Sequence, residues 1–243
     1  MAEAERPAFY ALSPGGWRDY WTLLHPPYTA WHLSYVAIGA AVATRIDGRW
    51  LAETLAGFFL GVGLAAHALD ELHGRPLRTR IPAPVLWTIA AIGLVGAVAL
   101  GIDGVIEVSG WIAVFIVVGA FLVVAYNLEA FGGLFHSDAW FSVAWGAFPS
   151  LTSSFVQQQR LTTAAVLVAA ACAFISAAQR VLSTPVRRLR RHVTSVRGEL
   201  VLDDGEREPV DAAALRAAPE AALRLLSVAM PVIAVGLVLS RRL

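Results

Sequence analysis

The chain has 243 residues, of which 57% are hydrophobic and only 15% are charged, and its mean hydropathy is +0.62. This balance excludes an ordinary soluble domain, in which about a quarter of the residues are charged, and indicates an integral membrane protein. The net charge of +1 argues against a nucleic-acid partner. All 19 basic residues are arginine, which excludes chemistry that needs a lysine Schiff base or a lysine general base.

Seven apolar runs follow one another along the chain, and most approach the roughly 20 residues that a membrane-spanning helix needs. In chain order they are Ala30–Ala43 (extended at its N-terminal side by Tyr28), Leu51–Ala68, Pro84–Leu100, Trp111–Tyr126, Ala139–Phe155, Thr162–Ala178 and Leu223–Leu239. The runs predict an all-α integral membrane protein in which residues 1–243 form one polytopic domain of about seven transmembrane helices.

The arginines predict the orientation of this domain. The segment after the second run has three arginines within residues 75–80 and the segment after the sixth has six within residues 180–197, whereas the loop after the third run has none. Cytoplasmic loops carry an excess of arginine and lysine. We therefore expect a bacterial plasma-membrane protein with a cytoplasmic N-terminus and cytoplasmic loops after the second, fourth and sixth runs.

Residues 187–219 differ in character from the rest of the chain. They are charged, and the stretch SVRGELVLDDGEREPV alternates like two short strands around an Asp-Asp-Gly turn. Asp211–Ala218 predicts a short helix. We interpret residues 187–219 as a small cytoplasmic insert between the sixth and seventh spans.

A first cluster of ionisable residues, HALDELHGRP, ends the second apolar run. On a helix, the spacing of His67, Asp70 and Glu71 places them on one face. Asp70 and His73 have the carboxylate-x-x-His spacing with which helical bundles offer two ligands to one metal ion. Ionisable groups near the bilayer typically mark a functional site, although a polar helix end at the water interface explains part of this cluster equally well.

A second cluster, NLEAFGGLFHSDAW, follows the fourth run and is therefore expected on the same membrane face. Glu129 and His136 are its candidate ligands. Asp138 is either a further ligand or, like Ser137, an N-cap of the fifth helix. His32, in the first run, is either another ligand or a hydrogen-bonded structural residue.

Together the clusters predict a mixed nitrogen and oxygen metal site, mononuclear or dinuclear, at the cytoplasmic mouth of an intramembrane pocket. The candidate ligands are His32, His67, Asp70, Glu71, His73, Glu129, His136 and Asp138, and the candidate catalytic residues are Asp70 and Glu71. We expect His67 and Glu129 to share one ion. Imidazole with carboxylate suits Fe, Zn or Mn, whereas Mg²⁺ prefers oxygen ligands. His25 and His192 are expected at the membrane interface.

Three stretches resemble the UbiA-type intramembrane prenyltransferases over about residues 17–190. LHPPYTAWHLSYVAIGAAVA is similar to the first helix of that family, HALDELHGRPLRTRIP to its first Asp-rich motif with the following Arg-Pro-Leu tail, and YNLEAFGGLFHSDAWFSVAWGAFP to the end of its fourth helix and its fifth helix. The resemblance implies a UbiA-like helical bundle and an isoprenoid substrate. The family's second Asp-rich motif is missing, because SAAQRVLSTPVRRLRR after the sixth run contains no acid.

The expected function is therefore a metal-dependent membrane enzyme on a UbiA-like scaffold, acting on an isoprenoid or another lipid that enters from the bilayer. One alternative is a magnesium-dependent prenyltransferase with a degenerate diphosphate site. In that case the diphosphate-binding residues are Arg75, Arg78, Arg187 and Arg188. The other alternative is a non-catalytic membrane subunit or a metal conduit.

Overall fold

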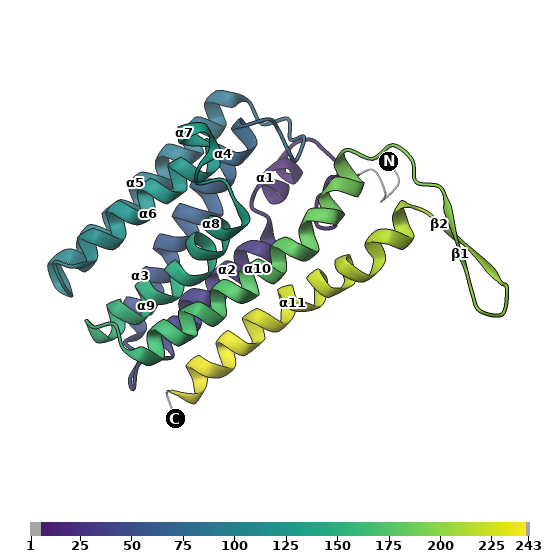
Figure 1. Cartoon of the computed structure of the whole chain (residues 1–243). Helices are drawn as coiled ribbons and strands as arrows, with labels where there is room; N and C mark the ends of the chain where they lie inside the picture. The colour runs from purple at the N-terminus through teal and green to yellow at the C-terminus, as the bar shows by residue number, and fades with distance from the viewer. Residues whose placement is uncertain (1–5, 242–243) are drawn as a thin grey trace.

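The computed structural model describes residues 6–241, which form helices joined by short loops and one β-hairpin. The elements are α1 (Trp17–Leu23), α2 (Pro26–Ala40), α3 (Gly48–Phe58), η2 (Phe59–Ala66), α4 (His67–Leu72), α5 (Ala83–Glu107), α6 (Ile112–Asn127), α7 (Ala130–Gly133), α8 (Asp138–Ser142), η3 (Val143–Ala147), α9 (Phe148–Gln158), α10 (Thr163–Arg191), β1 (Gly198–Val201), β2 (Arg207–Val210) and α11 (Ala212–Ser240). The long helices lie side by side, and the hairpin projects away from them between the end of α10 and the start of α11 (Figure 1).

Each of the seven predicted apolar runs lies largely within a helical segment of the structure. Four helices in residues 6–241 are long and apolar enough to cross a membrane, namely Gly48–Leu72, Ala83–Glu107, Thr163–Arg191 and Ala212–Ser240. Helix α6 is a shorter apolar helix, and α2 has only 15 residues, roughly 22 Å against a hydrocarbon core of about 30 Å. The all-α prediction is confirmed, whereas the number of spans stays a prediction.

Two π-helical segments, η2 and η3, interrupt otherwise continuous α-helices. A π-helical turn contains an extra residue, so it changes the direction in which the following side chains point. Segment η2 ends immediately before His67, and η3 contains Trp145. Both residues line the cavity described below, and π-helical turns are frequent at functional sites.

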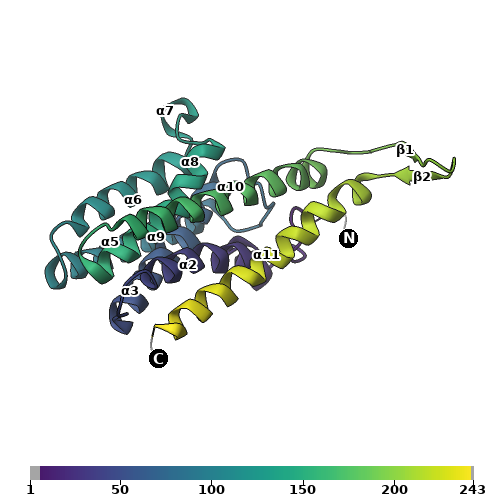
Figure 2. The same cartoon turned by 60° about the horizontal axis from the view of Figure 1, so that its bottom comes forward.

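Helix α2 packs chiefly against α11 and α9 (Figure 2). Its residues Trp31, Tyr35 and Val36 are fully buried, and Nε1 of Trp31 donates a hydrogen bond to the Tyr35 hydroxyl at 2.7 Å. Gly39 allows α9 to come close, because a Cβ atom at this position would lie 2.1 Å from the carbonyl oxygen of Ser150. Small residues at such contacts let the helices of membrane bundles approach each other. The shortest predicted span is thus tightly packed on two sides.

The predicted two-stranded insert is present as the antiparallel pair β1 and β2, in which Gly198 faces Val210. Gly205 in the connecting turn has a φ of +84°, a value that favours glycine. The separate short helix predicted at Asp211–Ala218 is wrong, because α11 begins at Ala212 and continues without a break. The Asp211 side chain caps its first turn by accepting a hydrogen bond from the Ala214 amide, and Pro219 is accommodated within the helix.

Candidate functional site

A polar cavity of about 550 Å³ lies where α4 and the loops around it meet the start of α2, the end of α6 and the C-terminal half of α10. All six histidines of the chain line it: His25, His32, His67, His73, His136 and His192. The two predicted clusters share the cavity, since Asp70 and Glu129 line it as well. Their convergence from segments about 60 residues apart confirms that they open on the same side of the molecule.

Two histidines in the cavity stack on each other. The ring centroids of His25 and His67 are 4.1 Å apart and their planes differ by 11°. The Tyr10 hydroxyl lies 2.9 Å from Nδ1 of His25. Burial raises the pKa of Tyr10, and burial together with the nearby His67 lowers the pKa of His25 well below its usual value. Either group can donate in this hydrogen bond, because a phenol and a neutral imidazole each have one donor and one acceptor.

Backbone carbonyls fix the tautomers of two other histidines. Nδ1 of His67 lies 3.1 Å from the Gly63 oxygen, and Nδ1 of His136 lies 3.0 Å from the Tyr126 oxygen. Because a carbonyl only accepts, each Nδ1 carries the proton and each Nε2 keeps its lone pair. This arrangement is typical of histidines that bind metal ions. His32 is also available for a ligand, since it is buried and neither of its ring nitrogens has a hydrogen-bond partner among the described residues.

Glu129 lies beside two histidines at the mouth of the cavity. Its Oε1 atom is 3.7 Å from Nε2 of His73 and 3.9 Å from Nε2 of His136, and both separations are too long for a hydrogen bond. The side chains of these three residues are 31–51% exposed, so solvent reaches them. His67, which we expected to share an ion with Glu129, makes no ion pair with it among the described residues and instead stacks on His25.

Arg187 and Arg191 form the basic wall of the cavity. They are one turn apart on α10 and both line the cavity. Neither has an acidic partner within 4.0 Å among the described residues, although two other arginines of the same helix are paired with carboxylates. Arg187 donates to the Thr184 hydroxyl and Arg191 to the Pro7 carbonyl, and neither of these acceptors carries a charge. Guanidinium groups without a carboxylate partner in a partly buried wall favour an anionic ligand, because guanidinium binds planar oxyanions through two parallel hydrogen bonds.

Asp138 has a different role from the one predicted. Its carboxylate is 64% exposed and forms an ion pair with Arg180, and Asp138 does not line the cavity. The N-cap of α8 is Ser137, whose hydroxyl accepts a hydrogen bond from the Trp140 amide. The structure therefore supports the capping interpretation of this dipeptide and not metal binding by Asp138.

Glu71, predicted as a catalytic residue and a metal ligand, is a structural residue. It is fully buried and does not line the cavity. Its carboxylate accepts hydrogen bonds from the amides of Leu77 and Thr79 and from the Thr79 hydroxyl, all at 2.8–2.9 Å. The i, i+1 step from Asp70 rotates Glu71 away from the cavity that Asp70 lines. Glu71 thus fixes the loop after α4, which carries His73.

We expect Glu71→Ala to lower the free energy of unfolding by about 2–3 kcal/mol, because it leaves two buried amides without an acceptor. Glu71→Gln should cost less, since the amide oxygen still accepts one of these bonds. Thermal unfolding in detergent, followed by circular dichroism, measures both effects. A Glu71→Ala variant as stable as the parent chain would contradict the structural role.

Three of the four arginines predicted to bind a diphosphate do not line the cavity. Nη1 of Arg75 donates to the Ile81 carbonyl at 2.6 Å, and Nη2 of Arg78 donates to the Arg191 carbonyl at 3.3 Å, so both arginines stabilise loops. Arg188 is exposed and does not line the cavity. Of the predicted set only Arg187 lines the cavity, and Arg188 is turned away from it by about 100° around the helix axis.

Several residues of the cavity wall were not predicted from the sequence. His25 and His192 were expected at the membrane interface but line the cavity, as do Tyr10, Tyr126 and Arg191. His25 has a left-handed backbone (φ 46°, ψ 54°) immediately before Pro26. One signal was available in the sequence: six histidines are many for a chain with so few charged residues.

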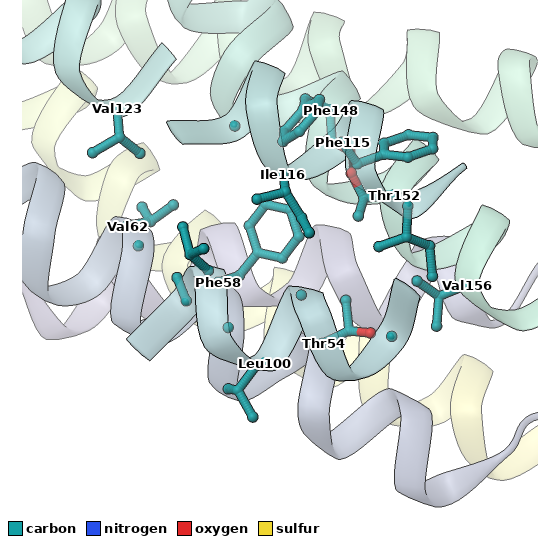
Figure 3. Close-up of a pocket in the computed structure, with 18 of the residues that line it drawn as sticks. Thr54, Phe58, Val62, Leu100, Phe115, Ile116, Val123, Phe148, Thr152 and Val156 are labelled. Atoms are coloured by element: carbon teal, nitrogen blue, oxygen red, sulfur yellow. Dashed lines mark hydrogen bonds between the residues drawn. The ribbon is translucent and has the colours of Figure 1, made fainter. Parts of the chain in front are cut away.

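An apolar pocket of about 140 Å³ adjoins the polar cavity and lies between α3, α5, α6 and α9. The rings of Phe58, Phe115 and Phe148 are among its lining groups (Figure 3). Val62 and Trp145 line both the pocket and the cavity. A ligand with a polar head and an apolar chain matches this pair of adjoining spaces.

Comparisons with protein-family models, with curated proteins and with solved structures give no significant match to the chain. Within residues 6–241, no three side chains of His, Cys, Asp and Glu surround a common point closely enough to hold a metal ion as they stand.

Proposed function

We propose that this chain is an integral-membrane, metal-dependent enzyme on a UbiA-like scaffold, which acts on the polar head of an isoprenoid or similar lipid. The observation that carries the proposal is that the polar cavity and the apolar pocket share Val62 and Trp145 as a common wall. Ligand sites are typically mostly apolar, with a few convergent polar groups. Here the two kinds of surface are separated into adjoining spaces, as an amphiphile requires.

The polar cavity has the groups that act on an anionic head group. Arg187 and Arg191 would bind its oxygen atoms through charge-assisted hydrogen bonds. Nε2 of His67 is a proton acceptor, because its Nδ1 atom is bonded to the Gly63 carbonyl. The second candidate function is a prenyltransferase-like transfer of an isoprenyl group. It is favoured by Arg187 and Arg191, which could bind a diphosphate.

The apolar pocket supplies a test of lipid binding that leaves the polar cavity unchanged. Gly57 lines the pocket, and a Cβ atom built on it meets no atom within 4 Å. Gly57→Leu should therefore fill part of the pocket without a clash. If the lipid loses room for two or three methylene groups, its affinity should fall roughly 15- to 60-fold, at about 0.8 kcal/mol for each group.

The measurement is binding of a photoreactive farnesyl phosphate to the chain in lipid nanodiscs, with mass spectrometry of the lipid to detect its conversion. Gly236→Leu is the matched control, because Gly236 also has open space around its Cβ position and lines none of the cavities described. Equal labelling of the Gly57→Leu and Gly236→Leu variants would overturn the assignment of the pocket. No labelling of the parent chain would overturn the proposed function.

A further inference from the structure

We propose that His73, Glu129 and His136 bind one divalent transition-metal ion at the mouth of the polar cavity. This inference gives a location for the metal ion of the proposed function. The catalytic role of the ion rests on the proposed function, whereas its location does not. The three residues come from three segments: His73 ends α4, Glu129 precedes α7, and His136 lies just before α8. No spacing in the sequence brings them together.

The two distances from Glu129 to the histidines fit a site that closes by a small side-chain movement. At metal–ligand lengths of about 2.1 Å, two ligands of a tetrahedral ion lie roughly 3.4 Å apart. The two histidine Nε2 atoms lie 3.7 and 3.9 Å from the same carboxylate oxygen. Each separation must shorten by a few tenths of an ångström. The His73 and Glu129 side chains are 51% and 43% exposed, so both have room to rotate.

The His136 ring and the Glu129 backbone are the two parts of the site that have a defined conformation. The His136 ring is fixed by the bond from its Nδ1 to the Tyr126 carbonyl and by stacking on the Tyr126 ring, with centroids 4.6 Å apart. Glu129 has a left-handed backbone (φ 48°, ψ 38°), although it is not glycine. Such a conformation costs a non-glycine residue about 1–2 kcal/mol, and strain of this kind clusters at ligand sites.

The donor set indicates the class of metal. Two imidazole nitrogens and one carboxylate oxygen suit Zn²⁺, Fe²⁺, Mn²⁺ or Co²⁺, and they suit Mg²⁺ poorly because Mg²⁺ prefers oxygen. Three protein ligands leave a coordination position for water or for an oxygen of the lipid head. A metal ion in this position would polarise that oxygen or activate the bound water.

The experiment measures Zn²⁺ and Co²⁺ binding to the full chain in detergent after removal of metal with a chelator. We expect one equivalent to bind. Glu129→Gln and His136→Ala should each weaken the affinity at least about 100-fold, since removing only an outer partner of a ligand costs about 10–100-fold. Co²⁺ absorption in the visible range reports the nitrogen and oxygen coordination directly.

His192→Ala is the matched control, because His192 lines the cavity but makes no ion pair with Glu129 among the described residues. Its metal affinity should equal that of the parent chain. The inference is overturned if the parent chain binds no metal, or if His67→Ala weakens binding while Glu129→Gln does not. Thermal unfolding of each variant separates loss of metal from loss of fold.

The metal is measured without lipid and the lipid probe is measured with and without metal. A chain that labels with farnesyl phosphate but binds no Zn²⁺ or Co²⁺ would contradict the metal site and the metal dependence of the proposed function, and it would leave the proposed lipid binding standing. A chain that binds one metal equivalent but no lipid would contradict the proposed function and leave the site standing.

Discussion

Glu220→Ala should destabilise the protein by about 3–5 kcal/mol, because it removes the carboxylate from a buried ion pair. Glu220 on α11 accepts hydrogen bonds from Nε and Nη2 of Arg190 on α10 at 2.7–3.0 Å. The two side chains are only 2% and 8% exposed. Without the carboxylate, the guanidinium charge stays buried beside the N-terminal segment, where it also donates to the Arg6 carbonyl at 3.2 Å.

The expected loss is measured by thermal unfolding in detergent and by retention of a monodisperse peak in size exclusion. The hairpin offers a matched control in the pair Glu199 and Arg207, which has a similar contact of 2.9 Å but is 55–68% exposed. Glu199→Ala should change the free energy of unfolding by less than about 1 kcal/mol. Similar losses in the two variants would show that the Arg190 pair does not join α10 to α11 as described.

The sequence predicts the helical segments well because their signal is local. Long apolar runs, the Asp-Asp-Gly turn and the capping residue Ser137 each depend on a few neighbouring residues. The errors arise where a helix continues past a signal that usually ends one. Helix α10 continues to Arg191, inside the insert predicted at residues 187–219, and α11 begins at Ala212 and includes Pro219, because packing between these helices outweighs the loss of a single backbone hydrogen bond.

The site is only partly predictable for a different reason. Helical periodicity places His67, Asp70 and Glu71 on one face of the helix. In the structure His67 and Asp70 line the cavity, whereas Glu71, one residue further along, points to the loop after α4 and binds its amides. The contacts of Glu129 with His73 and His136 depend on loop conformations, including a left-handed residue at position 129. Tertiary structure determines these contacts, and no pattern of spacing contains them.

Gly39→Leu should prevent stable folding, with a cost above about 4 kcal/mol, because overpacking here meets backbone and not a mobile side chain. A Cβ at position 39 would lie 2.1 Å from the Ser150 carbonyl oxygen and 2.7 Å from its Cα. Helices α2 and α9 would have to separate, and α2 also positions His32 and the start of the cavity wall.

Gly236→Leu on α11 is the control, since it adds the same side chain to a helical glycine with no atom within 4 Å of the new Cβ. The measurement is the yield of monodisperse protein in detergent and its thermal unfolding. Gly39→Ala, which adds only the Cβ, should already lower the unfolding temperature clearly below that of Gly236→Ala. Equal stability of these two alanine variants would mean that α2 and α9 do not approach as closely as the structure places them, and the cavity between the helix ends would then need a different wall.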